Sequence, residues 1–157
     1  MIYLVIFIVA ALVIGPVLWI RPSPREKQQL RLRAIAKDEG LKVYLRPIPH
    51  PRDEQERTFD ANIMAYVRPW TEKERKTKLP RYFIMGKEPG SDEWALYRSK
   101  NLLQKNELAD IPKTAALLEI NNEGVIVYWR ESGDEDRVKA MAKCMEGVAQ
   151  RLLNGVT

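Results

Sequence analysis

The sequence has one cysteine and one histidine among its 157 residues, and this scarcity excludes several kinds of chemistry. Cys144 alone cannot form a disulfide within the chain, which fits a reducing compartment. A zinc site needs further nitrogen or thiolate ligands beside His50, and Cys144 lies far away in sequence on a predicted helix. A nucleophile–base pair of Cys144 and His50 stays open as an alternative, but simple packing of Cys144 beside an apolar helix stripe is favoured.

Glycine is also sparse, and its eight copies are scattered without a GxGxxG or GxxxxGK[ST] pattern. A phosphate-binding loop of either kind is therefore not expected. Acidic residues cluster at turns and helix starts, where capping and solubility explain them; the clusters are Asp53-Glu54, Asp92-Glu93 and Asp134-Glu135-Asp136. We predict no catalytic, cofactor-binding or metal-binding residue and no enzymatic activity. An enzyme with an unrecognised site is the alternative.

Charge is absent from the first twenty residues, Met1 to Ile20, which are almost wholly apolar. A helix rises about 1.5 Å per residue, so roughly twenty such residues cross a hydrocarbon core about 30 Å thick. A cleaved signal peptide would instead need a basic start, a shorter apolar run and small residues at the cleavage site. We therefore predict a transmembrane anchor over residues 1–20, with Trp19 at the interface between lipid and water.

Basic residues dominate the segment that follows, with six between Arg21 and Lys37 against one acid. By the positive-inside rule, this excess predicts an N-terminus outside and a cytoplasmic C-terminal part. Ser23 and Glu26 have the spacing of a capping box, and Gly40 suits the end of a helix. We predict a basic juxtamembrane helix within residues 21–40. The candidates for contact with lipid headgroups are Trp19, Arg21, Arg25, Lys27, Arg31 and Arg33.

Six later segments have the alternation, or the β-branched and aromatic content, that is typical of strands. They are Leu41–Arg46, Phe59–Arg68, Arg81–Met85, Glu93–Arg98, Ala116–Ile120 and Val125–Arg130. Short links favour antiparallel pairing, Asn121 to Gly124 is the clearest hairpin turn, and Val125–Arg130 resembles a central strand. Thr71–Lys78 is interpreted as a helical turn or a loop, and Leu102–Leu108 as a short helix.

The last helix is predicted from a cap and acids at Ser132 to Asp136 and ends at Gly155. Its apolar residues recur at steps of three and four: Val138, Met141, Met145, Val148 and Leu152. Packing on the sheet is the favoured interpretation of this stripe. Because methionine adapts to varied surfaces, the stripe is also our candidate face for a partner.

Together these elements predict an α+β fold for the cytoplasmic domain, residues 41–157. We expect a mainly antiparallel sheet flanked by an N-terminal and a C-terminal helix that pack on one side. A small, partly closed barrel capped by the last helix, as in pleckstrin-homology-like domains, is the alternative topology.

The net charge limits which kinds of partner are expected. The chain carries +5, much of it beside the predicted anchor, where topology and anionic headgroups account for it. Nucleic-acid binding would need a denser basic stripe and is not favoured. We expect a lipid bilayer and an unidentified membrane or cytoplasmic protein as partners, with no cofactor. An anionic-lipid or nucleic-acid binding module is the alternative.

Two stretches of the sequence resemble those of a known group of proteins. They are Val17 to Glu26, followed by the basic helix ending at Gly40, and Gly124 to Gly133, which leads into the final helix. These runs resemble small bacterial inner-membrane proteins of the group labelled preprotein translocase subunit YajC. The resemblance implies a bacterial inner-membrane location and an accessory role in a membrane complex. It implies no catalytic residue.

Overall fold

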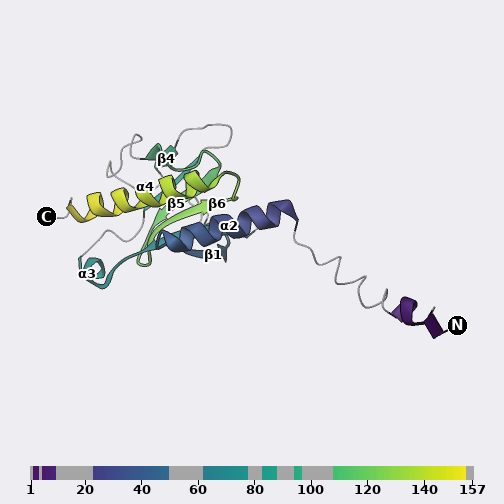
Figure 1. Cartoon of the computed structure of the whole chain (residues 1–157). Helices are drawn as coiled ribbons and strands as arrows, with labels where there is room; N and C mark the ends of the chain where they lie inside the picture. Colours follow the sequence, from purple (N-terminus) through teal and green to yellow (C-terminus); the bar gives the residue numbers. More distant parts are fainter. Residues whose placement is uncertain are drawn as a thin grey trace. The chain divides into compact units, whose positions relative to one another are not determined.

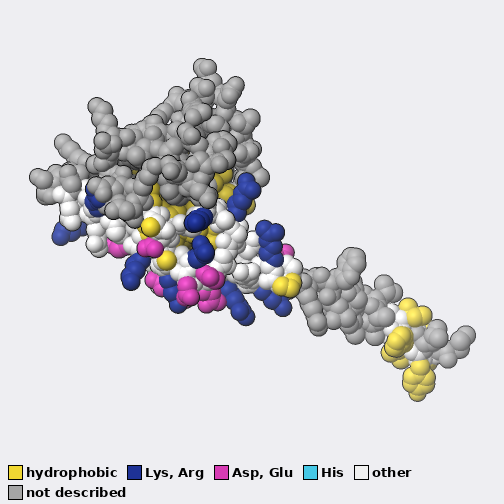
Figure 2. Space-filling view, turned by 90° about the horizontal axis from the view of Figure 1, so that it is seen from above, with side chains coloured by type: hydrophobic (Ala, Val, Ile, Leu, Met, Phe, Trp, Pro, Cys, Tyr) yellow, Lys and Arg dark blue, Asp and Glu magenta, His cyan; other side chains and the backbone are white. Residues whose placement is uncertain are grey.

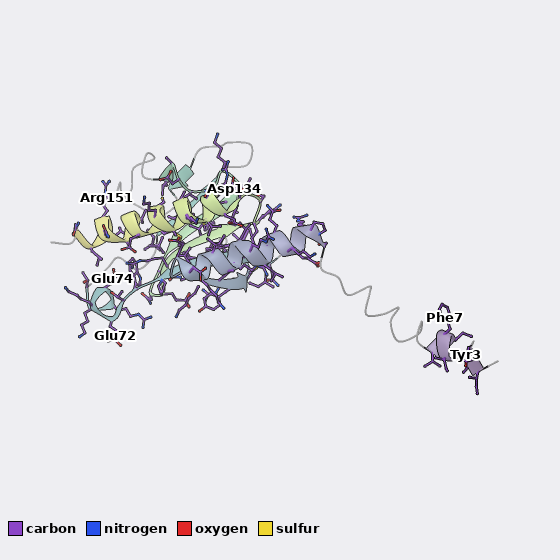
Figure 3. The ribbon with its side chains drawn as sticks, viewed as in Figure 1. Tyr3, Phe7, Glu72, Glu74, Asp134 and Arg151 are labelled. Atoms are coloured by element: carbon purple, nitrogen blue, oxygen red, sulfur yellow. The ribbon has the colours of Figure 1, made fainter. Side chains whose placement is uncertain are left out.

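The computed structural model describes residues 2–3, 5–9, 23–49, 62–77, 83–87, 94–96 and 108–154. The chain divides into two compact units, Met1–Leu30 and Arg31–Thr157, and each is described by itself. In the first unit, residues 2–3 and 5–9 are helical and exposed, with Tyr3 and Phe7 projecting outward (Figure 3). Within the described residues, no helix combines the length and the apolar character that a membrane crossing requires. The rest of the predicted span, residues 10–20, lies outside the described residues.

Helix α2, Pro24–Asp38, confirms the predicted basic helix and both of its end signals. At its start, the Ser23 amide donates to Glu26 Oε2 at 2.6 Å and the Glu26 amide donates to Ser23 Oγ at 3.2 Å. At its end, Gly40 has φ +80°, and the Leu41 amide donates to the Ala36 carbonyl at 2.8 Å. This bond from the residue after the glycine defines a Schellman cap, which needs a residue that tolerates positive φ.

The second unit is built around a six-stranded sheet in which every pairing is antiparallel (Figure 1). The strand order is β1-β2-β6-β5-β3-β4. The strands are β1 Lys42–Arg46, β2 Ile63–Pro69, β3 Phe83–Lys87, β4 Trp94–Leu96, β5 Ala115–Ile120 and β6 Gly124–Trp129. This arrangement confirms the predicted antiparallel sheet and the central place of β6. Because β1 and β4 are the two ends of the order, the described strands form an open sheet and not the alternative barrel.

Strand boundaries differ from the prediction in β3, which extends over Gly86 and Lys87, beyond the predicted end of this strand at Met85. Gly86 is paired on both sides, with Ala95 of β4 and Leu117 of β5. Pairing with two neighbours therefore overrides the low strand preference of glycine. The start of the predicted strand at Phe59 and most of the predicted helix at Leu102–Leu108 lie outside the described residues.

Two helices cover one face of the sheet, as predicted. Helix α4, Glu135–Asn154, begins at Asp134, whose Oδ1 accepts from the Arg137 amide at 3.0 Å. Residues of α4 and of α2, including Leu32 and Ala36, share one core with Tyr66, Val127 and Trp129 of the sheet. Figure 1 shows α4 above α2 in the view, both alongside the strands.

The opposite face of the sheet is buried as well, which we did not predict. A second core on that face consists of Ile63, Ala65, Val67, Leu117, Ile126 and Tyr128. All six residues of β6 are buried, so the strand contributes to both cores. A strand buried on both faces loses the polar–apolar alternation of a half-exposed strand, which explains the continuous apolar run of β6.

The β5–β6 hairpin provides a sharp test of the fold. A Cβ atom at Gly124 would lie 1.9 Å from the Arg68 carbonyl oxygen, so Gly124→Ala must push β2 and β6 apart. We expect a loss of roughly 3 kcal/mol in the free energy of unfolding, measured by denaturant titration. Gly147→Ala is the matched control, because its Cβ would meet no atom within 4 Å in the middle of α4. That substitution should stabilise the protein by up to about 1 kcal/mol, and equal effects of the two changes would contradict the β2–β6 contact.

Candidate functional site

The candidate lipid-contacting residues fall into three groups in the structure. Trp19 and Arg21 lie outside the described residues. Arg25, Lys27 and Arg31 are exposed on α2, as contact with headgroups requires. Arg33 differs from them, because its guanidinium is engaged with the domain.

Arg33 is held by a buried carboxylate at the junction between β6 and α4. Its Nε and Nη2 donate to Oε1 and Oε2 of Glu131 at 2.7 and 2.6 Å. The Tyr66 hydroxyl donates to the same Oε1 at 2.9 Å. We call Arg33, Tyr66 and Glu131 the Glu131 clamp. It joins α2 and β2 to the segment after β6, so it fixes the second half of the basic helix on the domain.

The Glu131 clamp is unusual in its backbone and in its burial. Glu131 has φ +57°, a left-handed conformation that side chains other than glycine rarely adopt, and its side chain is 2% exposed. Burial and the nearby Glu131 carboxylate raise the pKa of Tyr66, so the phenol stays protonated and keeps donating. The hydrogen bonds to Glu131 raise the pKa of Arg33. The Arg33 guanidinium therefore stays charged and the Tyr66 phenol stays neutral, so Glu131 accepts hydrogen bonds from one cation and one neutral donor.

A second ion-pair network fixes the end of β2. Arg68 donates to both oxygens of Glu74 at 2.6 and 2.8 Å, and to both oxygens of Glu146 at 2.8 and 3.1 Å. Glu74 lies on α3, Glu72–Arg75, so these four residues of the segment that we interpreted as a helical turn or a loop form a helical turn (Figure 3). The Arg68 guanidinium also lies 5.6 Å from the centroid of the Trp70 ring. We call Arg68, Glu74 and Glu146 the Arg68 network; it ties α3 and α4 to β2.

A buried polar pair lies on the opposite face of the sheet. The Tyr128 hydroxyl donates to Glu119 Oε2 at 2.8 Å, and Asn121 Nδ2 donates to Oε1 at 2.9 Å. Burial, and then the Glu119 charge, raises the pKa of Tyr128. Both carboxylate oxygens of Glu119 are thus bonded within the fold, as those of Glu131 are.

The candidate nucleophile Cys144 is buried on α4. Burial, assisted by the charge of Asp110, raises the pKa of its thiol to about 11. The thiolate is therefore scarce at neutral pH, which disfavours nucleophilic attack. Its possible base, His50, lies outside the described residues. Among the described residues, no group of three or more histidine, cysteine or acidic side chains is arranged to hold a metal ion.

The candidate partner face on α4 lies inside the domain. Val138, Met141, Met145, Val148 and Leu152 are each at most 3% exposed and belong to the core between helices and sheet. The structure therefore uses this stripe for packing, which was the favoured interpretation. Asp134 and Arg151 mark the first and last parts of the helix in Figure 3.

Among the described residues of the second unit, the most exposed large apolar side chains lie on the edge strand β1. Tyr44 is 42% exposed and Leu45 is 62% exposed. Arg46 forms a bidentate ion pair with Glu123 of the β5–β6 turn, and its guanidinium lies 4.8 Å from the centroid of the Tyr44 ring. Sequence reasoning predicted this strand but not its exposed edge, because the edge position depends on strand order. We call residues 42–46 the β1 edge.

One face of the described part of the domain carries charges of both signs. On the face shown in Figure 2, Lys and Arg side chains are interspersed with Asp and Glu across the described part. No continuous basic field is visible among the described residues on that face.

The Glu131 clamp is testable by removing its charge. Glu131→Gln keeps the size and the left-handed backbone but breaks a buried ion pair, so we expect a loss of about 2 kcal/mol in unfolding free energy. Glu123→Gln is the control: it breaks the exposed pair with Arg46 and should cost below about 1 kcal/mol. Urea titration measures both changes, and a smaller effect at Glu131 than at Glu123 would contradict the clamp.

The Arg68 network predicts acid sensitivity. The hydrogen bonds from Arg68 lower the pKa of Glu74 to about 2, below its ordinary value of 4.5. A depressed folded-state pKa stabilises the fold above pH 4.5, and this stabilisation is lost as the pH falls from about 5 to 2. We expect Glu74→Gln to cost roughly 2 kcal/mol at pH 7 and much less near pH 2. At that pH Glu74 is protonated in the unfolded chain, and about half of the folded chains are protonated at this position, so little of the stabilisation by the charge is left. A variant whose deficit is unchanged across this range would contradict the role of the charge.

Comparison with known proteins adds no relative: no protein-family model, no curated protein and no solved structure matches this chain.

Proposed function

We propose that this chain is a single-pass membrane protein whose α+β domain binds another protein on the cytoplasmic side of the membrane. One observation carries the proposal: a helical apolar segment with exposed side chains precedes a capped basic helix that continues into the domain. Residues 1–20 serve as the anchor, and the basic residues of α2 lie next to the headgroups.

The exposed apolar side chains support the anchor. Between 50% and 85% of each is exposed, and they are Ile2, Tyr3, Val5, Ile6, Phe7, Ile8 and Val9. Successive helical residues point about 100° apart, so these side chains surround the helix instead of forming one stripe. Exposure of such a side chain to water costs about 1.5–3 kcal/mol relative to burial. In a bilayer these side chains contact lipid instead of water, which removes this cost. The backbone is also suited to lipid, because a helix satisfies its own backbone hydrogen bonds.

The basic residues support the orientation. Arg25, Lys27 and Arg31 are exposed, whereas Arg33 is occupied by Glu131. The first three are thus available to anionic headgroups, at about 1 kcal/mol for each basic residue near the surface. Their position after the apolar segment favours a cytoplasmic domain.

A binding role is favoured over catalysis because the buried carboxylates are engaged in hydrogen bonds within the domain. The buried carboxylates of Glu119 and Glu131 each have both oxygens bonded to side chains of the domain. Within the described part of the domain, the features available to other molecules are surfaces, above all the β1 edge. An accessory role in a membrane complex, as the YajC resemblance implies, is one specific form of this function.

The anchor predicts a simple fractionation result. The full chain with a C-terminal tag should sediment with membranes and resist alkaline carbonate, whereas a chain lacking residues 2–20 should be soluble. The tag should be cleaved by protease only when the cytoplasmic side is open. Replacement of Arg25, Lys27 and Arg31 by Gln is the control, which should keep membrane insertion but weaken the preference for one orientation.

A full chain that stays soluble, or a truncated chain that still resists carbonate, would contradict the anchor. The binding role is tested in the same membranes, with photocrosslinking residues placed at exposed positions of the domain. Crosslinks to one protein from neighbouring positions would support the role. Turnover of a substrate that is lost on a point substitution would contradict it.

A further inference from the structure

We propose that the β1 edge binds an extended acidic segment of a partner protein, which adds an antiparallel strand to the sheet. This inference rests on the proposed function and names the surface and the kind of partner. The binding mode is strand addition, in which backbone hydrogen bonds supply affinity and alternate side chains supply specificity.

The position of β1 in the sheet supplies the backbone groups. β1 is the first strand in the order and pairs with β2 over all five of its residues, Lys42 to Arg46. No other described strand pairs with it. In an antiparallel strand, alternate residues direct their N–H and C=O groups away from the existing partner. Tyr44 and Leu45, near the middle of this edge, are the most exposed large apolar residues among those described in the second unit.

The side chains of β1 define what an added strand would meet. Lys42, Tyr44 and Arg46 pair with Val67, Ala65 and Ile63, and therefore share the face of the second core. Val43 and Leu45 pair with Tyr66 and Met64 on the helix face. An added strand would thus meet two cations around an aromatic ring on one face and two apolar residues on the other. An alternation of acidic and apolar side chains complements both faces.

Charge argues against a second copy of this chain as the occupant. In a full antiparallel pairing of two β1 strands centred on Tyr44, Lys42 of each copy lies opposite Arg46 of the other. Like charges directly opposite each other destabilise a strand pair. Glu123 neutralises one of the two cations within the protein, which still leaves an excess of positive charge for an acidic partner.

The alternating direction of the side chains along β1 also argues against lipid as the main ligand of the β1 edge. Tyr44 and Leu45 are neighbours in a strand, so their side chains point to opposite faces of the sheet. A flat membrane surface could receive one of them at a time, whereas an added strand contacts both faces together.

The test uses the full chain in nanodiscs of zwitterionic lipid and the fluorescent peptide Glu-Val-Thr-Val-Glu. Its acids lie opposite Lys42 and Arg46 in the antiparallel register. We expect it to bind at least about five-fold more tightly than Lys-Val-Thr-Val-Lys, measured by fluorescence polarisation. Lys42→Glu should weaken binding of the acidic peptide by a similar factor, and the matched control Lys139→Glu, an exposed position on α4, should not.

Two further measurements separate strand addition from other contacts. A peptide N-methylated at its three central residues should not bind, because it cannot donate to the ladder. Hydrogen exchange at residues 42–46 should slow on addition of the unmodified peptide. Equal binding of the methylated or basic peptide, or protection outside β1, would overturn the inference. So would protection of β1 by anionic vesicles alone, or by raised protein concentration alone.

Failure of this inference is distinguishable from failure of the proposed function. A chain that inserts in membranes and crosslinks to a protein, but shows no protection of β1, refutes strand addition and leaves the anchored binding role intact.

Discussion

The buried ion pair between Arg33 and Glu131 is the contact on which the arrangement of the domain most depends. Burying a carboxylate at a left-handed backbone position is unfavourable twice, through desolvation and through strain. Three hydrogen bonds, two from Arg33 and one from Tyr66, compensate for it. As a result, the Glu131 side chain connects the segment after the central strand β6 to the basic helix α2 and to β2. The pair also divides the basic residues of α2, since Arg33 serves the fold while Arg25, Lys27 and Arg31 stay exposed.

The features that were predictable from the sequence are those that depend on neighbours along the chain. Ser23 and Glu26 cap α2, Gly40 ends it, and the stripe from Val138 to Leu152 packs on the sheet. Each depends on residues within about four positions of one another, where spacing alone determines which groups meet. The hairpin at Asn121 to Gly124 belongs to the same class, because Asn121 and Gly124 are bonded across the turn.

The features that were not predictable depend on residues far apart in the chain. The residues around Glu131 do not indicate its role, because that role depends on Arg33, 98 positions earlier. Arg68 likewise meets Glu146 only because α4 crosses the end of β2. The edge position of β1 follows from strand order, and Gly86 becomes part of a strand because β4 and β5 pair with it on either side. Local preference cannot specify any of these pairings, since it carries no information on which segments are adjacent.

In the function that we propose, membrane anchoring and the exposed β1 edge would reinforce each other physically. A strand of five residues offers few outward backbone groups, and exposed ion pairs add at most about 1 kcal/mol each, so an added segment would bind weakly from free solution. Confinement of both proteins to one membrane changes that balance, because a tethered partner reaches effective concentrations in the millimolar range. An edge that binds weakly is then sufficient for a partner in the same membrane, and proteins in solution leave it largely unoccupied. The lysine and arginine on the edge disfavour pairing of two copies, which confinement would otherwise promote equally. A short, charged edge on a domain anchored as we propose would therefore suit the selection of a different membrane-bound partner.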